Sequence, residues 1–129
     1  MTSLSKLQNL QNKNIVVIGG SGYLGRAACE VCAELGGNLI VASRNKDNCE
    51  ETAKNLVKDL GQNHIGIDCD ITCKKSVEKF YAIIKDKYKK IDVLIISAWN
   101  GKKNTWDSIK QDDWDTEMDV CLNSIFRII

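Results

Sequence analysis

The sequence predicts an α/β fold in which one parallel sheet of four strands alternates with helices in the doubly wound manner. Four short apolar runs, rich in β-branched residues, alternate with stretches whose apolar residues recur every three or four positions. A glycine loop lies between the first run and the first such stretch. This alternation predicts right-handed crossovers and helices on both faces of the sheet. At 129 residues and 43% hydrophobic, the chain fits one globular domain.

The elements are expected in a fixed order along the chain. Strands are predicted at 14–18, 38–42, 64–67 and 92–97 because these runs are short and apolar. Helices are predicted at 22–35, 46–60 and 113–129, the first two ended by glycines, and a further helix carries the apolar stripe of residues 77–88. Residues 1–13 form an N-terminal lead, and residues 14–129 form the domain.

Charge and cysteine content disfavour several classes of protein. The net charge is +1, so no overall field favours nucleic acid or an anionic membrane as a partner. The polar lead lacks the apolar core of a secretory signal and no run is long enough to span a membrane, which predicts a cytoplasmic protein. The six cysteines of the chain are expected to be reduced thiols packed in the core, and no metal site is expected. The Cys29–Cys32 pair falls inside a predicted helix, unlike redox pairs at helix N-termini.

The loop VIGGSGYLG, residues 17–25, predicts a site for a dinucleotide. An apolar strand precedes it and an amphipathic helix follows it, and this setting directs backbone N–H groups and the helix dipole toward a pyrophosphate. Gly19 is expected to make the sharp turn, Gly22 to allow close approach of the phosphates, and Gly25 to let the helix pack on the strand.

With this loop, the sequence resembles the short-chain dehydrogenase/reductase family along essentially its whole length. The spacing of the three glycines fits the extended subgroup, and Asp70-Ile71-Thr72 is similar to the turn whose Asp contacts adenine in that family. Residues 91–98 resemble the strand leading into its Asn-Asn-Ala-Gly motif, and residues 114–126 resemble its helix that runs to a dimerising face. The resemblance implies the N-terminal half of a Rossmann-type NAD(P)-binding fold. It also implies hydride transfer between a nicotinamide and a carbonyl or alcohol.

The loop and the resemblance together imply a set of residues that contact the cofactor. Gly19, Ser21, Gly22, Tyr23, Leu24 and Gly25 are expected around the pyrophosphate, Ser43 and Arg44 at a 2′-phosphate, Asp70 and Ile71 at adenine, and Ser97 and Ala98 at ribose.

The end of the second predicted strand favours NADP(H) over NAD. In such folds an acidic residue there binds the ribose hydroxyls of adenosine, whereas an Arg accommodates a 2′-phosphate. Residues 41–46 read VASRNK and offer no carboxylate before Asp47. Arg44 can pair bidentately with a phosphate, although it could also be a solvated loop charge. NADP is therefore the expected cofactor, with NAD as the alternative.

The residues that carry the reaction in that family are missing, so no catalytic residue is assigned. The Ser and the Tyr-x-x-x-Lys of the family follow a further strand, whereas this sequence stops in the helix before it. Tyr81 and Lys85 match the motif by letters only, because they lie on the third predicted helix. Trp99 replaces the glycine that gives the cofactor room, and Cys121 stands where the family has an Asn, with Asn123 on another side of the helix.

Two polar segments have more than one interpretation. Residues 100–104 could face a substrate above the carboxyl ends of the strands, or could be a surface excursion. Five acids near the start of the last predicted helix are interpreted as capping and solvation, because their spacing spreads them around the helix. These acids are Asp112, Asp113, Asp115, Glu117 and Asp119.

The apolar end of the chain predicts association with other copies. Ile125, Phe126, Ile128 and Ile129 come without a cap, and the outer edge of the fourth strand would be open. We expect the truncated N-terminal portion of an oxidoreductase of this family, inactive alone, whose parent acts on an unidentified small carbonyl or hydroxyl compound. The alternatives are a non-catalytic nucleotide-sensing or scaffold module, favoured by Trp99, and a fragment of a nucleotide-sugar epimerase or dehydratase. Arg44 disfavours the last, because such enzymes commonly hold NAD with an acidic residue.

Overall fold

The four strands form one parallel sheet, as predicted. The structure is a computed structural model that describes residues 7–99 and 105–129. β1 (Asn14–Ile18), β2 (Asn38–Ser43), β3 (Ile65–Asp68) and β4 (Val93–Ile96) lie in the order β3-β2-β1-β4, and every pair is parallel. All four carboxyl ends therefore meet at one edge of the sheet, where open α/β folds bind ligands.

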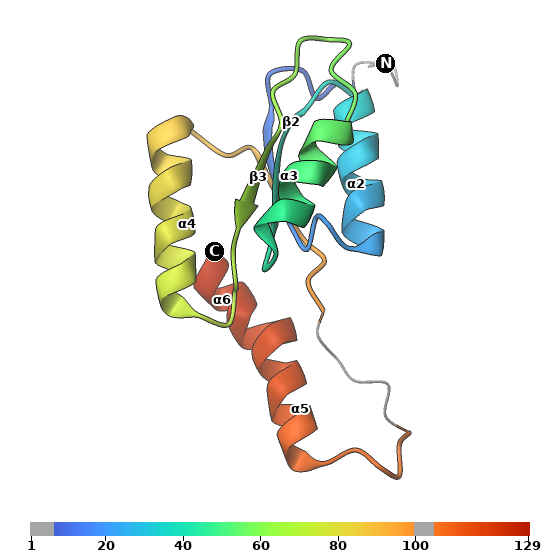
Figure 1. Ribbon diagram of the computed structural model, residues 1–129, viewed down its shortest axis with the longest axis vertical. Helices are drawn as coiled ribbons and strands as arrows, with labels where there is room; N and C mark the ends of the chain where they lie inside the picture. The colour runs from blue at the N-terminus through green and yellow to red at the C-terminus, as the bar shows by residue number, and fades with distance from the viewer. Residues whose placement is uncertain (1–6, 100–104) are drawn as a thin grey trace.

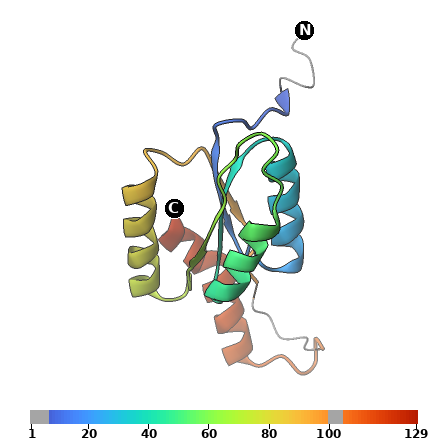
Figure 2. The ribbon, with the colours of Figure 1, turned by 45° about the horizontal axis from the view of Figure 1, so that its top comes forward.

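Helices cover both faces of this sheet (Figures 1 and 2). α2 (Tyr23–Glu34) and α3 (Lys46–Asn55) lie on one face, and α4 (Lys74–Lys87) and α6 (Ser124–Ile128) lie on the other. α5 (Gln111–Met118) joins α6 through the π-helical turn η1 (Asp119–Asn123), so the last predicted helix is one helical rod with a wider turn inside it. α5 projects beyond the sheet and buries none of its residues (Figure 1).

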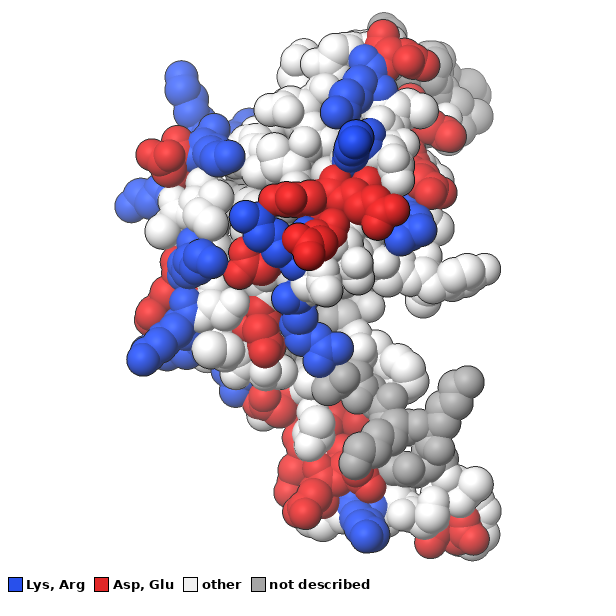
Figure 3. Space-filling model, in the orientation of Figure 1, with Lys and Arg blue, Asp and Glu red and all other residues white. Residues whose placement is uncertain are grey.

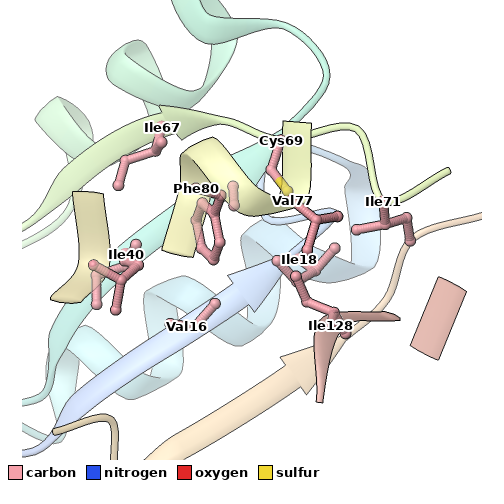
Figure 4. Close-up of a cluster of buried hydrophobic side chains, with 11 residues drawn as sticks. Val16, Ile18, Ile40, Ile67, Cys69, Ile71, Val77, Phe80 and Ile128 are labelled. Atoms are coloured by element: carbon pink, nitrogen blue, oxygen red, sulfur yellow. The ribbon is translucent and has the colours of Figure 1, made fainter. Parts of the chain in front are cut away.

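Successive residues of the central strand enter two separate cores. Val16 and Ile18 pack with the α4 face, where Phe80 and the C-terminal Ile128 also lie (Figure 4). Ile15 and Val17 pack with the opposite face, under the side chains of α2 and α3. Because both faces of β1 are buried, its sequence is continuously apolar and not alternating.

The prediction that the second helix extends to residue 60 is wrong. α3 ends at Asn55, and Leu56 turns to extended backbone with ψ 148° while its side chain stays buried. The next carbonyl, that of Val57, accepts a hydrogen bond from His64 Nε2 at 2.8 Å. Val57 and Leu60, which fall within the predicted helix, are 42% and 55% exposed. The Val57 carbonyl therefore bonds to the His64 side chain and not to a backbone N–H of a longer helix.

Cysteine packing is confirmed for only part of the set. All six side chains are free thiols; Cys29, Cys49 and Cys69 are buried, whereas Cys73 and Cys121 are exposed, contrary to expectation. The Cys29–Cys32 pair does lie inside α2, and burial raises the pKa of the Cys29 thiol to about 12. A thiol so perturbed stays protonated, which is the reverse of what redox chemistry needs.

Charges of both signs are interspersed on the face of the molecule that Figure 3 shows. Three of the acids near the last helix have identifiable local partners: Asp113 accepts the Lys110 N–H at the start of α5, Asp115 accepts from Gln111 Nε2 at 2.7 Å, and Asp119 pairs with Arg127 at 3.2 and 2.6 Å. Across residues 7–99 and 105–129, no group of three or more His, Cys, Asp or Glu side chains could hold a metal ion. None of the helices in this described part is both long enough and apolar enough to cross a membrane.

Candidate nucleotide-binding site

A cavity of about 510 Å³ opens at the edge of the sheet where the four strands end. Its walls come from the segments that directly follow β1, β2, β3 and β4, together with one residue of η1. The twelve residues expected to contact a cofactor all line it: Gly19, Ser21, Gly22, Tyr23, Leu24, Gly25, Ser43, Arg44, Asp70, Ile71, Ser97 and Ala98. The parallel sheet thus brings together four segments that lie far apart in the sequence.

The glycine loop is fixed by close backbone packing. Gly19 has a φ of +80°, and its N–H donates to the Ala42 carbonyl of β2 at 2.7 Å. A Cβ on Gly19 would lie 2.8 Å from Ala98 N, and a Cβ on Gly25 would lie 2.1 Å from the Gly19 carbonyl oxygen. These two positions therefore exclude any side chain on structural grounds alone. Gly25 packs on Gly19 and Gly20, which directly follow β1, and not on the strand itself as predicted.

Gly22 is less tightly packed than these two glycines, so an added Cβ would require a shift of only a few tenths of an ångström. A Cβ there would meet only the Gly19 carbonyl oxygen, at 3.2 Å. Its φ of −80° and ψ of 173° suit any residue. Since Gly22 lines the cavity, the lack of a side chain leaves space for a ligand.

The N-terminus of α2 supplies unpaired donors to the cavity. The first bond of the helix runs from the Arg26 N–H to the Gly22 carbonyl at 2.8 Å, and no side chain caps the helix. The N–H groups of Tyr23, Leu24 and Gly25 precede that bond and so have no acceptor within the helix. Together with the helix dipole, such donors favour an anion.

The end of β2 forms a second polar wall of the cavity. Ser43 and Arg44 line it, followed by Asn45 and Asn48 from the start of α3. Asn45 Oδ1 accepts the Asn48 N–H at 2.9 Å and thereby caps α3. Lys46 lies outside the lining and pairs with Glu50 at 3.5 Å. Arg44 is thus the cation that this segment presents to the cavity.

The turn after β3 lines a third wall. Asp70 Oδ1 accepts both the N–H and the hydroxyl of Thr72, at 2.9 and 2.6 Å, which fixes the carboxylate in the turn. Ile71 lines the cavity but is mostly buried in the core of the α4 face. Asp70 is the one acid among the residues that line the cavity in the described part of the chain.

Comparisons with known proteins agree with this geometry. The family model for the short chain dehydrogenase matches residues 13–129. The chain belongs to the short-chain dehydrogenase family. It is 30% identical to the 3-oxoacyl-(acyl-carrier-protein) reductase FabG of Vibrio cholerae over 120 residues, which are 93% of this chain and 48% of that reductase. It is also 35% identical to carbonyl reductase family member 4 of Danio rerio over 83 residues, which are 64% of this chain and 34% of that relative.

A solved structure shows the same fold. A short-chain type dehydrogenase/reductase from Mycobacterium marinum superposes with a TM-score of 0.86 at 20% identity, over 98% of this chain and 51% of that one. The chain spans about half the length of the short-chain dehydrogenases that it matches over most of its own length.

The fourth wall contains the departures from the short-chain dehydrogenase pattern. The Ser97 N–H donates to the Ile18 carbonyl at 2.9 Å, which holds this segment against the end of β1. Trp99 lines the cavity and is 62% exposed, and Val120 of η1 also lines it. Neither Cys121 nor Asn123 belongs to the lining, so Val120 takes the inward position on this turn. Residues 100–104, interpreted as a substrate loop or a surface excursion, lie outside the described residues.

Tyr81 and Lys85 are not part of this site. Both lie on α4 and neither lines the cavity. The Tyr81 hydroxyl donates to the Ile128 carbonyl of α6, and burial raises the pKa of this tyrosine. Tyr81 is therefore a structural contact between two helices, although its side chain is 40% exposed and does not join the core of the α4 face.

Seven residues of the lining were not assigned to the cofactor from the sequence. They are Ile18, Asn45, Asn48, Cys69, Thr72, Trp99 and Val120. The N-cap at Asn45 could have been found from an Asn directly before a helical pattern. Val120 had no such signal, because its position depends on how the last helix packs against the sheet.

Proposed function

We propose that this chain binds NADP(H) in the cavity, with the adenosine 2′-phosphate at Ser43 and Arg44. The observation that carries the proposal is the polar wall at the end of β2, which has a guanidinium and a hydroxyl where an NAD-binding site would have a carboxylate. No carboxylate of the described residues forms an ion pair with Arg44. A guanidinium can donate two parallel hydrogen bonds to a phosphate, whereas NAD would leave this group unused.

Titration of the chain with NADPH and NADH tests this proposal. Arg44→Ala should weaken NADPH binding by about 10- to 100-fold, since hydrogen bonds to charged groups contribute about 1.5–3 kcal/mol, and should leave NADH binding nearly unchanged. Lys46→Ala is the matched control, because it removes a neighbouring cation that does not line the cavity. Equal affinity for NADPH and NADH in the unmodified chain would refute the assignment of NADP(H).

The rest of the cavity fits the other parts of such a ligand. The uncapped N-terminus of α2 and the open space beside Gly22 suit the pyrophosphate, which needs backbone donors and close approach. Asp70 and Ile71 would hold adenine, and Ser97 and Ala98 would line the ribose. Gly19 and Gly25 contribute by allowing the close backbone packing that shapes the loop around the pyrophosphate.

We further propose that the whole protein is an NADP(H)-dependent oxidoreductase acting on a small carbonyl or hydroxyl compound. When bound, the nicotinamide would supply the hydride or accept it. In the described residues no lysine or histidine lines the cavity. The chain by itself should therefore bind NADPH without oxidising it faster than the buffer does when aldehydes and ketones are added.

A non-catalytic nucleotide-sensing module is the second candidate function. Trp99 favours it, because a large aromatic lines the cavity where related sequences have a glycine. Trp99→Gly distinguishes the two functions through binding. If the indole blocks the nicotinamide, the variant should bind NADPH more tightly while its affinity for adenosine 2′,5′-bisphosphate stays the same. If the site accepts the whole cofactor already, both affinities should stay unchanged.

Association between copies also remains a proposal, as does the expected cytoplasmic location. Leu122, Phe126 and Ile129 are exposed apolar side chains on the last helical segment, and Val93 and Leu94 of β4 are more than one-third exposed. Exposed apolar side chains favour association where they form a patch. The measured mass in solution at several protein concentrations, compared with that of Phe126→Ser, tests whether this surface is used.

A further inference from the structure

Three side chains from separate elements form a hydrogen-bonded chain along the wall of the cavity. Ser21 Oγ of the glycine loop lies 2.7 Å from Ser43 Oγ at the end of β2. Ser43 Oγ lies 3.0 Å from Cys49 Sγ of α3. Ser21 and Ser43 line the cavity, whereas Cys49 lies behind them with 0% of its surface exposed.

Cys49 is held firmly in this place. α3 packs so closely on β3 that a Cβ on Gly66 would lie 2.4 Å from the Cys49 carbonyl carbon. Burial raises the pKa of the Cys49 thiol, so the sulfur keeps its proton near neutral pH and can donate it. The second contact of this sulfur, to the Ser43 carbonyl, is longer, at 3.9 Å.

The Ser43 hydroxyl has one proton to donate and two lone pairs to accept with. The structure offers that proton three acceptors besides a ligand: Ser21 Oγ at 2.7 Å, the Asn45 carbonyl at 3.4 Å and, if the thiol proton turns to the distant Ser43 carbonyl, the Cys49 sulfur at 3.0 Å. Sulfur is the weakest of these acceptors, and the Ser43 oxygen is much nearer to the thiol than the Ser43 carbonyl, so we take the thiol as the donor in this pair. A thiol that donates to Ser43 Oγ occupies one lone pair, and a proton from Ser21 can occupy the other. The Ser43 proton is then left to point into the cavity. Without the thiol, the hydroxyl is free to turn toward the Asn45 carbonyl.

We infer that Cys49 is a positioning residue, which holds Ser43 as a hydrogen-bond donor toward the cavity and thereby strengthens the preference for a ribose 2′-phosphate. This inference rests on the proposed NADP(H) site. On this inference, a buried cysteine that does not contact the ligand contributes measurably to the preference for a ribose 2′-phosphate. It also links the glycine loop to the 2′-phosphate wall through one network, and such networks couple their members energetically.

The test compares two probes, adenosine 2′,5′-bisphosphate and adenosine 5′-monophosphate, by calorimetric titration. Cys49→Ala should reduce the ratio of the two affinities by about 3- to 10-fold, as expected for one lost hydrogen bond. Cys49→Ser, which keeps a donor, should retain the ratio of the unmodified chain to within about twofold. Cys32→Ala is the control, because this half-buried cysteine of α2 does not line the cavity or contact Ser43. If Cys49→Ala does not fold, Cys49→Val fills the volume without a donor and gives the same comparison.

A double-mutant cycle separates positioning from packing. In a Ser43→Ala background, Cys49→Ala should leave the affinity ratio unchanged, because the hydroxyl it acts through is gone. A Cys49→Ala variant that weakens both probes by the same factor would show a role in packing only and overturn the inference. An unmodified chain with no preference for the 2′-phosphate would refute the NADP(H) proposal and this inference with it. A ratio of the two affinities that Cys49→Ala leaves unchanged would refute this inference alone.

Discussion

The addition of one methyl group should destabilise the fold at Gly25, whereas at Gly22 it should mainly weaken ligand binding. A Cβ at Gly25 would lie 2.1 Å from the Gly19 carbonyl oxygen and 2.7 Å from its carbon. Both atoms belong to the backbone, so the first turn of α2 or the loop itself must move by about 1.3 Å or more to reach the 3.4 Å of an ordinary contact. Overpacking of this kind costs about 1–3 kcal/mol, and we expect Gly25→Ala to lie near the upper end. That loss is large against the total stability of about 5–15 kcal/mol of a typical domain.

Gly22→Ala should spare the fold and affect the site. The new Cβ meets only one atom, at 3.2 Å, in ordinary backbone geometry. Alanine is a poorer N-cap than glycine, but it also reduces the entropy of the unfolded chain by about 0.4–1 kcal/mol. The net change in the free energy of unfolding should therefore stay within about 1 kcal/mol, while the methyl group intrudes into the cavity and weakens binding of NADPH.

Urea unfolding followed by circular dichroism, together with calorimetric titration of NADPH, measures both effects. With a urea m-value of about 1–3 kcal/mol/M, a loss of about 3 kcal/mol moves the midpoint for Gly25→Ala down by 1 M or more. Gly22→Ala serves as its control, because both variants make the same chemical change in the same loop. A Gly25→Ala chain within about 1 kcal/mol of the unmodified protein would contradict the close packing on which this reasoning rests.

Three further predictions concern pH and the core. Burial lowers the pKa of His64 below its usual 6.5, so the unfolded chain takes up the proton more readily and stability should fall as the pH drops below 6.5. Urea midpoints at pH 7.5 and 5.5 check this, and the difference between them should be smaller in His64→Gln. The Lys90 ammonium and the Asn14 N–H lower the pKa of Asp92 to about 2, so the stability that this carboxylate contributes is present above pH 3.8 and is lost as the pH falls toward 2. In Asp92→Asn, the free energy of unfolding should change less with pH over that range. Ile128 is 3% exposed in the core of the α4 face, so Ile128→Ala should cost about 2–4 kcal/mol, whereas Phe126→Ala, at an 88% exposed position, should change thermal stability little.

The class of fold and most of the residues that line the cavity could be predicted from local patterns in the sequence. β1 and β2 are apolar runs buried on both faces, and the loop between β1 and α2 carries glycines where backbone packing leaves no room for side chains. Both signals are local in the sequence, because a continuous apolar run and a glycine-rich turn are patterns of adjacent residues. Given a parallel sheet, the carboxyl ends of the strands must share one edge, so all twelve expected contact residues line one cavity. Their contact with a cofactor stays a prediction.

Three features depend on tertiary contacts and could not be predicted from the sequence: where α3 ends, which residue of η1 faces the cavity, and what lies behind Ser43. His64 takes the Val57 carbonyl and also accepts the Leu39 N–H at 3.1 Å, and neither contact follows from the helical pattern. Ser21 and Ser43 are 22 residues apart in the chain, yet their hydroxyls lie 2.7 Å apart because β1 and β2 are neighbours in register. Hydrogen bonds between side chains depend on positions that packing fixes to fractions of an ångström, and residue periodicity carries no information on that scale.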